Sequence, residues 1–384
     1  MSNGIRRVLV LWADGSAANY GVRVLAEGMA DLARAAWGTD IEVDLQDFGV
    51  GNSEVSFGTR SILRDLGRKK GPIKEKLSRY DLILDSGAGD SFADIYGFRR
   101  LMFIFYAQHT AFRLGIPVVM GPQTIGPFNT AIGRWAARKS LRRMCTVVTR
   151  DTQSAKYARD LGRPADVEST DVVFALEPPP MGQGRDVILN ISGLLWFPNG
   201  HIDAARYRAE LAELVDALQE QGRQVSLLAH VVNSPRGNDD EDAIAEFQRD
   251  YGFSLESISP ASLRQVRSVL AGASIVIGSR MHACLNALSA GTPAIPWAYS
   301  RKFAPLMRDI GWDHIVDLAD LATRPARATL ELLASTNSAQ FDEEVLAVQQ
   351  RARERLSATV LALRQVDSAR LGPPAADHFW KDLR

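Results

Sequence analysis

The segment at residues 273–297 constrains the fold more strongly than any other part of the chain. It combines a short buried strand at residues 275–277, a Gly-Ser turn, a helix over residues 280–290 and a second strand. Ser279 is the expected N-cap of the helix, and Gly291 followed by Thr292-Pro293 ends it. Strand, helix and strand in this order predict a parallel α/β sheet.

Two cationic side chains, Arg280 and His282, are predicted in the first turn of this helix, just beyond the carboxyl end of the strand. A cation in a first turn opposes the helix dipole. The pattern therefore favours an anion held by these side chains and by backbone N–H groups, at the sheet edge where ligands bind in α/β folds. The alternative is that Arg280 extends to solvent and His282 caps a local group.

The first half of the chain shows the same order of elements. A strand at residues 8–12 leads into a turn without G-x-G-x-x-G, so a dinucleotide fingerprint is not supported. A strand from residue 81 ends in Gly87-Ala-Gly89, which either lets a ligand approach the backbone or simply makes a tight turn. Asp90 follows as a candidate to hold or deprotonate a sugar hydroxyl, with a solvated carboxylate as the alternative.

Other predicted strand ends also carry polar side chains. Two prolines stiffen the loop around Gln123 and could hold that side chain toward a cleft, unless it faces water. Arg150 either neutralises an anion or pairs with Asp151 to lock its turn, and the pairing is favoured. Asn190 and His230 are expected near strand ends of the second half, where they would line the cleft.

An acidic run at residues 239–242 matches the D-x-D pattern that binds a metal–nucleotide complex in some glycosyltransferases. The run also opens a predicted helix at residues 243–249, where carboxylates stabilise the helix dipole, and this capping role is favoured. The sequence shows no cluster with metal-ligand spacing. We therefore expect no metal and no cofactor.

A Pro/Gly-rich stretch at residues 177–186 is the predicted boundary between two domains. It separates residues 1–176 from residues 187–384, and both parts show the same strand–turn–helix order. A length of 384 residues suits two domains of ordinary size. We expect two Rossmann-like α/β domains facing across a cleft.

The charge balance limits the classes of partner. Lys+Arg and Asp+Glu both number 45, which argues against a general nucleic-acid or membrane-surface binder but leaves local basic clusters open. The two cysteines, Cys145 and Cys284, show no metal spacing and indicate a reducing compartment. No apolar segment reaches the roughly twenty residues of a membrane span, so we expect a cytoplasmic protein.

Several motifs together resemble the polysaccharide pyruvyl transferase family, whose fold is similar to that of the two-domain GT-B glycosyltransferases. The most specific are Gly278-Ser-Arg-Met-His-Ala, the segment at residues 287–295 and Tyr299-Ser-Arg-Lys. Weaker similarities occur in the family's order. They are Gly15-Ser16 with Asn19-Tyr-Gly21 (Ala17 and Val22 depart from the pattern), the Gly87 turn, the Gly121 loop and Arg150-Asp151.

The resemblance implies transfer of a pyruvyl group from phosphoenolpyruvate to sugar hydroxyls of a cell-envelope polysaccharide or glycolipid precursor, forming a cyclic ketal. The N-terminal domain would take the saccharide, which could be lipid-linked, and the C-terminal domain the donor. His282 and Asp90 are the expected catalytic residues. The expected substrate-binding residues are Asn19, Gly87, Gly89, Gln123, Arg150, Asn190, His230, Ser279, Arg280 and Lys302.

Two alternatives stay open at this stage. A GT-B glycosyltransferase using a nucleotide sugar shares the architecture, and so does a carbohydrate-binding relative without catalytic activity. The acceptor sugar and the oligomeric state, including a homo-oligomer, are left open by the sequence.

Overall fold

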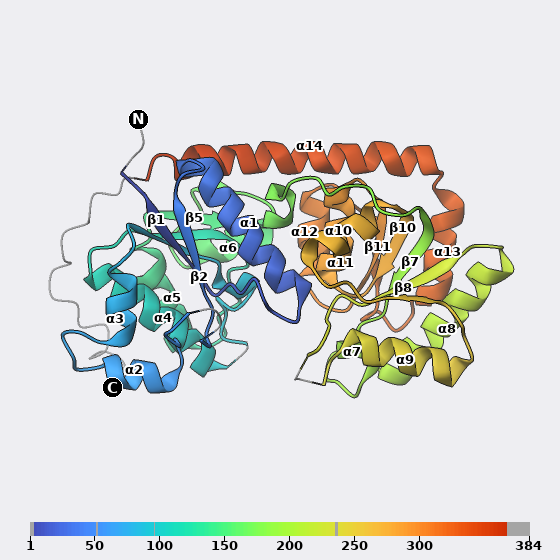
Figure 1. Cartoon of the computed structure of the whole chain (residues 1–384), viewed down its shortest axis with the longest axis horizontal. Helices are drawn as coiled ribbons and strands as arrows, with labels where there is room; N and C mark the ends of the chain where they lie inside the picture. Colours follow the sequence, from blue (N-terminus) through green and yellow to red (C-terminus); the bar gives the residue numbers. More distant parts are fainter. Residues whose placement is uncertain (1–3, 51–52, 96, 235–236, 367–384) are drawn as a thin grey trace. The chain divides into compact units, whose positions relative to one another are not determined.

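The computed structural model describes residues 4–50, 53–95, 97–234 and 237–366, which form two compact α/β units (Figure 1). Of these residues, unit 1 contains 4–16, 25–176 and 353–366. Unit 2 contains 17–24 and 177–352. The chain thus passes from unit 1 to unit 2 after Leu176, where the Pro/Gly-rich stretch begins, but each unit also includes a segment from beyond the predicted boundary.

Unit 1 is built on a six-stranded parallel sheet in the order β2-β1-β3-β4-β5-β6. Its strands are β1 (Arg7–Leu11), β2 (Glu42–Gln46), β3 (Leu82–Asp85), β4 (Val118–Gln123), β5 (Thr146–Thr149) and β6 (Val167–Glu168). Its helices are α1 (Tyr20–Trp37), which begins in unit 2, and α2 (Thr59–Asp65), α3 (Pro72–Leu77), α4 (Phe98–Arg113), α5 (Ala131–Leu141) and α6 (Thr152–Asp160). Short 3₁₀ turns η1 (Gly87–Gly89) and η2 (Val172–Ala175) follow β3 and β6.

Both faces of this sheet are apolar, as a parallel sheet covered by helices requires. Because side chains alternate along a strand, β1 sends Leu9 and Leu11 into one buried cluster and Val8 and Val10 into the other. Residues of α4 and α5 complete the first cluster, and residues of α1 and of the C-terminal helix complete the second.

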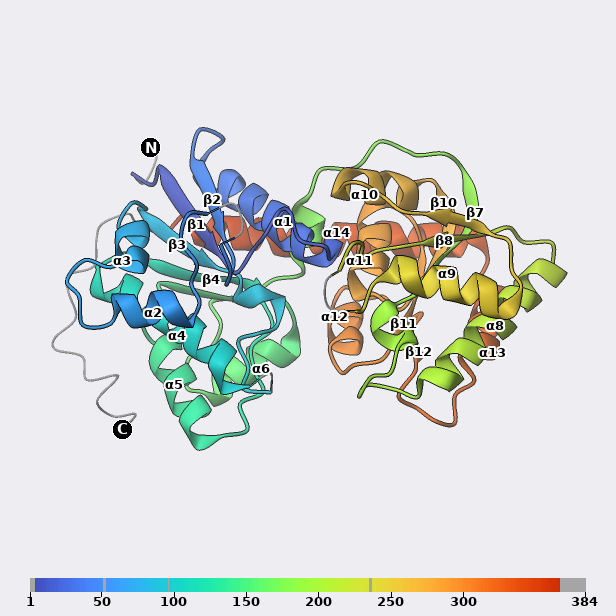
Figure 2. The same ribbon diagram turned by 60° about the horizontal axis from the view of Figure 1, so that its bottom comes forward.

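Unit 2 contains a second six-stranded parallel sheet, in the order β12-β11-β10-β7-β8-β9. Its strands are β7 (Arg185–Asn190), β8 (Val225–Leu228), β9 (Glu256–Ile258), β10 (Ala273–Gly278), β11 (Ala294–Ala298) and β12 (Val316–Asp317). Its helices are α7 (Gly193–Trp196), α8 (Ala204–Glu220), α9 (Asp240–Tyr251), α10 (Leu263–Ala271), α11 (Met281–Ala290), α12 (Phe303–Asp309) and α13 (Pro325–Ser335). Helix α13 lies beside α8 (Figure 2), and α14 (Ser338–Leu363) runs from unit 2 into unit 1.

Two parallel sheets flanked by helices confirm the predicted α/β, GT-B-like fold class. In each sheet the strand order reverses next to the first strand of the unit, between β1 and β3 and between β7 and β10. Ligands of open α/β sheets bind at the carboxyl ends of the strands beside such a switch point. The topology therefore directs attention to the loops that follow β1 and β3 in unit 1, and β7 and β10 in unit 2.

Helix α12 begins at Phe303 although Pro305 lies in its first turn. A proline is tolerated in a first turn because the missing N–H would have no partner within the helix. The Gly-, Ser- and Arg-rich stretch at residues 49–71 contains α2. Within the described residues, no helix is both long and apolar enough to cross a lipid bilayer.

Candidate functional site

The switch point of unit 2 is organised around Asn190, the last residue of β7. Its side-chain Oδ1 accepts a hydrogen bond of 3.0 Å from the backbone N–H of Arg280, and its Nδ2 donates to the Leu228 carbonyl at 2.9 Å. Asn190 is fully buried. Its amide therefore joins the ends of β7, β8 and β10 and fixes the start of α11.

A second buried group, the carboxylate of Asp240, ties the same loops together from the start of α9. Asp240 is fully buried and accepts six hydrogen bonds of 2.7–3.4 Å. The donors are Nε and Nη2 of Arg280, the backbone N–H groups of Gly193, His230 and Val231, and Nδ2 of Asn190. A buried carboxylate with this many donors is fully satisfied, so Asp240 holds the three loops in one arrangement.

The expected geometry at the start of α11 was wrong in one respect. Arg280, not Ser279, is the N-cap residue, and it makes no side-chain cap. Its guanidinium turns back to Asp240 and also donates to the Asn238 carbonyl at 2.9 Å. Burial lowers the pKa of Arg280, but the charge and hydrogen bonds of Asp240, together with Tyr299 and Tyr207, outweigh it and leave the pKa raised. The hydrogen bonds to Asp240 and Asn238 use Nε and Nη2 of Arg280. As far as the described residues show, Nη1 is therefore the guanidinium nitrogen best able to bind a ligand.

Ser279 is held by a tyrosine that the sequence analysis missed. The hydroxyls of Ser279 and Tyr207 lie 2.8 Å apart, and Tyr207 also accepts from the Ser192 N–H at 3.0 Å. Burial raises the pKa of Tyr207 to about 12, which keeps it a neutral donor and acceptor. Ser279 therefore takes part in the structure of the site rather than capping α11.

The ring of His282 packs against the segment at residues 17–24, which belongs to the same unit. A Cβ on Gly21 would lie 2.8 Å from His282 Nδ1, so only glycine allows this approach. The Asn19 side chain accepts from the Gly21 N–H at 2.8 Å and shapes the turn at the start of α1. The backbone of Asn19 also pairs with Val231 beyond the end of β8. Asn19, predicted as a substrate-binding residue, thus lies beside His282.

His230 is fully buried beside Asn286, a residue of α11. Arg267 Nη1 donates to Asn286 Oδ1 at 3.0 Å, which fixes the orientation of the amide because a guanidinium only donates. The Asn286 Nδ2 group then donates to the His282 carbonyl at 2.7 Å and faces His230 Nε2 at 3.4 Å.

An Nε2 atom that faces an N–H donor must carry a lone pair, so His230 is a neutral imidazole protonated on Nδ1. Burial lowers the pKa of His230 well below its ordinary value, and the positive charges of His282 and Arg280 act in the same direction. No hydrogen-bond partner of Nδ1 is present among the described residues. His230 therefore supplies a hydrogen-bond donor that does not ionise near neutral pH.

Lys302 lies at the start of α12, as its N-cap residue. Burial lowers the pKa of Lys302 to about 8. Nearby, burial raises the pKa of Tyr299, opposed by the positive charge of Arg280. The interaction between Tyr299 and Arg280 indicates that the loop after β11 belongs to the same region of unit 2 as the start of α11.

The remaining predicted site residues lie in unit 1, in the turn after β3 and at the carboxyl ends of β4 and β5. Gly87, Ala88 and Gly89 all have positive φ, and their N–H groups donate to the side chains of Asp85 and Ser86 and to the Ser86 carbonyl. The turn therefore satisfies its own donors in this conformation. Burial raises the pKa of Asp85 to about 6, against the effect of hydrogen bonds from Gln108 and Gly87.

Gln123 and Gly87 are packed directly together. A Cβ on Gly87 would lie 1.3 Å from Gln123 Oε1, so the amide occupies the space that any other residue at position 87 would need. Gln123 is fully buried, and neither amide atom has a hydrogen-bond partner in the part of the chain that the structure describes. An amide in this state can turn to meet a polar ligand group.

Arg150 is buried and paired, as favoured from the sequence. Its Nη1 lies 3.2 Å from Asp171 Oδ2, and its Nε lies 3.8 Å from Asp151 Oδ2. Both carboxylates also cap helical turns, Asp151 through the Ser154 N–H and Asp171 through the Val173 N–H. Arg150 therefore joins the turns after β5 and β6.

Asp90 ends the η1 turn and is half-buried. Asp94, the other carboxylate in this part of the sequence, accepts hydrogen bonds of 2.7–2.8 Å from Asn129 and Thr130. Burial acts to raise the pKa of Asp94, but these bonds outweigh it and leave the pKa lowered. Asp94 is thus a structural residue, and the role of Asp90 stays a prediction.

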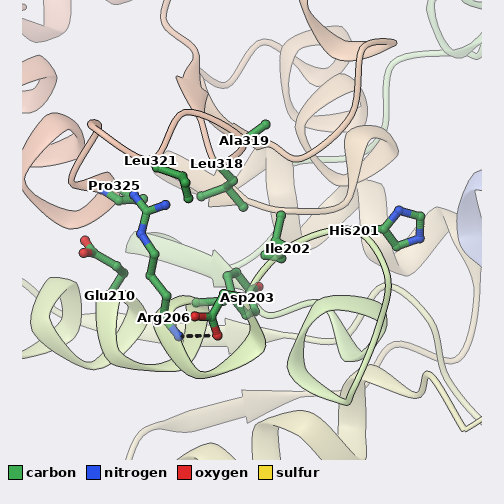
Figure 3. Close-up of a pocket in the computed structure, with 10 residues that line it drawn as sticks. His201, Ile202, Asp203, Arg206, Glu210, Leu318, Ala319, Leu321 and Pro325 are labelled. Carbon is green, nitrogen blue, oxygen red and sulfur yellow. Dashed lines mark hydrogen bonds between the residues drawn. The ribbon is translucent and has the colours of Figure 1, made fainter.

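Unit 2 also contains a cavity of about 140 Å³ between α8 and the loop after β12 (Figure 3). Arg206 extends from α8 toward Leu321 and Pro325. The polar groups of its wall are already bonded, Arg206 to the carbonyls of Asp320 and Thr323 and Glu210 to the Ala326 N–H. Its lining residues are His201, Ile202, Asp203, Arg206, Tyr207, Glu210, Leu318, Ala319, Leu321 and Pro325, none of which was a predicted site residue.

The acidic run caps α9 as favoured, with Asp239 accepting from the Glu241 N–H at 2.8 Å. No group of three or more His, Cys, Asp or Glu side chains suited to a metal ion occurs in the described ranges. Trp196, which precedes this region in the chain, is buried, and its indole N–H donates to Glu246.

Comparisons with known proteins identify a family. The family model of polysaccharide pyruvyl transferases matches residues 19–301. The amylovoran biosynthesis protein AmsJ of Erwinia amylovora is 22% identical over 261 residues, which span 62% of this chain and 61% of that protein. The chain thus covers less than two thirds of this relative.

Solved structures are similar in fold. A UDP-GlcNAc 2-epimerase from Neisseria meningitidis, bound to UDP-GlcNAc, matches with a TM-score of 0.55 at 10% identity, covering 94% of this chain and 100% of that one. A UDP-GlcNAc 2-epimerase from Methanocaldococcus jannaschii matches with a TM-score of 0.53 at 9% identity, covering 86% and 92%. At such identities the likeness concerns the fold alone.

Proposed function

Because this chain belongs to the polysaccharide pyruvyl transferase family, we propose that it transfers a pyruvyl group from phosphoenolpyruvate to two hydroxyls of a saccharide. The product is a cyclic ketal, and inorganic phosphate is released. The similarity to a protein of amylovoran biosynthesis supports a saccharide precursor of a cell-surface polysaccharide as the acceptor.

The observation that carries the proposal is the grouping of donors at the switch point of unit 2. Arg280, His282 and His230 come together there, around the Asn190 and Asp240 framework. Phosphoenolpyruvate carries a phosphate and a carboxylate, and fixed cations with neutral N–H donors are what such a ligand needs. Lys302, with a pKa of about 8, adds a positive charge at neutral pH.

The chemistry assigns His282 the central role. A proton delivered to C3 of phosphoenolpyruvate makes C2 electrophilic, and the first sugar hydroxyl forms a bond to C2 as it loses its proton. Phosphate then leaves with the electron pair of the C2–O bond, and the second hydroxyl closes the ketal with loss of its own proton. His282 can donate the first proton; its ring packs against Gly21, and its backbone carbonyl accepts a hydrogen bond from Asn286.

The test follows phosphate release from phosphoenolpyruvate with a panel of glycosides. We expect His282→Gln to lower kcat by about 100-fold or more, the usual contribution of a general acid. Arg280→Lys should raise the donor KM, because a planar guanidinium shared by Asp240 and the donor is replaced by a point charge. His314→Gln, which changes a histidine bonded to Glu344 elsewhere in unit 2, is the matched control and should keep wild-type turnover.

Two results would contradict these assignments. Full turnover by His282→Gln would show that His282 is not the general acid. Binding of a nucleotide sugar without binding of phosphoenolpyruvate would favour the glycosyltransferase alternative.

A further inference from the structure

A group of exposed basic and apolar side chains lies on unit 1, outside the turns that follow β1 and β3. We call it the α2 patch and define it as Arg60, Leu63, Arg64, Leu66, Phe98 and Arg99, together with the basic run at residues 68–70. All of these side chains are exposed, and Leu63, Leu66 and Phe98 are exposed to 65%, 47% and 43%.

The parts of the patch on α2 and on the start of α4 are adjacent, because these two helices are joined. Arg99 Nη2 donates to Thr59 Oγ1 at 3.0 Å, and the Tyr106 hydroxyl donates to Asp65 at 2.7 Å. Figures 1 and 2 both show α2 beside α3 and α4. Residues three and four apart on a helix share a face, so Arg60, Leu63 and Arg64 point the same way.

The one carboxylate within residues 59–70 does not balance these charges at the surface. Asp65 is fully buried and accepts from the N–H groups of Ile73 and Lys74, so it serves the start of α3. Five basic side chains of the same stretch face outward: Arg60, Arg64, Arg68, Lys69 and Lys70. The exposed carboxylates of the flanking sequence are Glu54 and Glu75. A chain with no net charge thus carries a locally positive surface.

We propose that the α2 patch docks unit 1 onto an anionic lipid surface. Lysines and arginines around exposed leucine and phenylalanine side chains are the combination that binds anionic membranes from the aqueous side. The basic residues meet the headgroup charge, and Leu63, Leu66 and Phe98 enter the apolar boundary below it. A hydrophilic polyanion would use the cations but gives no role to the three apolar side chains, which favours lipid.

Vesicle sedimentation of the full chain tests the proposal without any substrate, so its outcome does not depend on the pyruvyl transfer. The probes are vesicles of phosphatidylcholine alone and of phosphatidylcholine with phosphatidylglycerol. We expect binding to the anionic vesicles only, weakened by salt.

Arg64→Gln with Lys69→Gln should weaken this binding roughly 25-fold, about fivefold for each charge. Leu63→Ser should weaken it by about fivefold, because a partly inserted side chain is lost.

Matched controls change equally exposed residues elsewhere. Leu346→Ser, at a leucine exposed to 62% in α14, and Arg264→Gln with Arg308→Gln should bind like the wild type. Circular dichroism and release of phosphate with a water-soluble acceptor show that the patch variants stay folded and active.

Three outcomes would overturn the proposal. The first is the absence of binding to anionic vesicles. The second is equal weakening by the control variants. The third is binding that Leu63→Ser leaves unchanged and that soluble dextran sulfate abolishes, which would identify a site for anionic polysaccharide.

Discussion

Gly21 is the residue on which the position of His282 depends most directly. The space that a side chain at position 21 would need is filled by the imidazole ring, 2.8 Å from the ideal Cβ. We expect Gly21→Ala to displace His282 and to lower kcat by roughly tenfold or more, since misplacing a catalytic group by about 1 Å has large effects. Steady-state phosphate release measures this.

Gly15→Ala is the control, because a Cβ there would meet Leu45 at an ordinary 3.6 Å. It should keep wild-type activity. If Gly21→Ala left kcat unchanged, either His282 would take no part in the reaction or its ring would move without affecting the reaction.

The burial of Lys302 predicts a pH dependence. Its pKa is lowered to about 8, so the side chain is positively charged below that pH and becomes neutral above it. If Lys302 binds the donor, KM for phosphoenolpyruvate should rise as pH increases through about 8, while kcat changes less. In Lys302→Arg the charge persists, so the rise in KM should disappear from this range. The same alkaline rise in both enzymes would assign it to another group.

Residue identity in the site could be predicted only in part. Asn190, His230 and His282 were found because each follows or opens a recognisable element, and the local pairing of Arg150 was foreseen from its neighbour Asp151. Tyr207 and Asn286 were missed because they lie inside helices with ordinary amphipathic patterns. Their roles come from tertiary contacts, for which the sequence carries no local signal.

At the scale of elements, the start of α9 shows two adjacent carboxylates with different roles. Asp239 is the N-cap, whereas Asp240 is the buried partner of Arg280. Asp239→Ala should cost about 1 kcal/mol of unfolding free energy, the usual value of a lost cap. Asp240→Ala should cost about 3–5 kcal/mol, because it leaves a buried guanidinium and several N–H groups without an acceptor. Urea unfolding of both variants measures the difference, and equal losses would contradict the assignment.

Contacts from neighbouring elements explain the error at α11. Ser279 was expected to cap α11 because serine is a common N-cap. In the structure the Arg280 N–H is satisfied by the Asn190 side chain from the neighbouring strand, and the serine hydroxyl is bonded to Tyr207. Propensity predicts the existence of a helix well, but neighbouring strands decide its cap.

At the scale of the whole molecule, two parallel sheets were predictable because buried strands alternate with helices along both halves of the chain. The assignment of residues 17–24 to unit 2 and of residues 353–366 to unit 1 was not predictable. The Pro/Gly-rich stretch marks where the chain passes from one unit to the other, but it does not indicate which other segments cross between them. The first of these segments brings Asn19 and Gly21 to His282, the proposed general acid.

Phosphoenolpyruvate should therefore protect unit 2 selectively. We expect slower amide hydrogen exchange around residues 19–22, 190–193, 230–232 and 278–283, by up to about 100-fold with the donor at a hundred times its Kd. Residues 59–70, which include α2, serve as the internal reference and should exchange at an unchanged rate. Protection confined to unit 1 would place the donor elsewhere.

The way Asp240 joins three loops also bears on where this chain can diversify. A length change within residues 190–193, 230–231 or 278–280 would move at least one donor away from this fully buried carboxylate. By contrast, the outer loops at residues 197–203 and 318–324 supply none of these donors. Insertion or exchange should therefore be tolerated in those outer loops, while the tied segments keep their length in any engineered or natural variant that still folds.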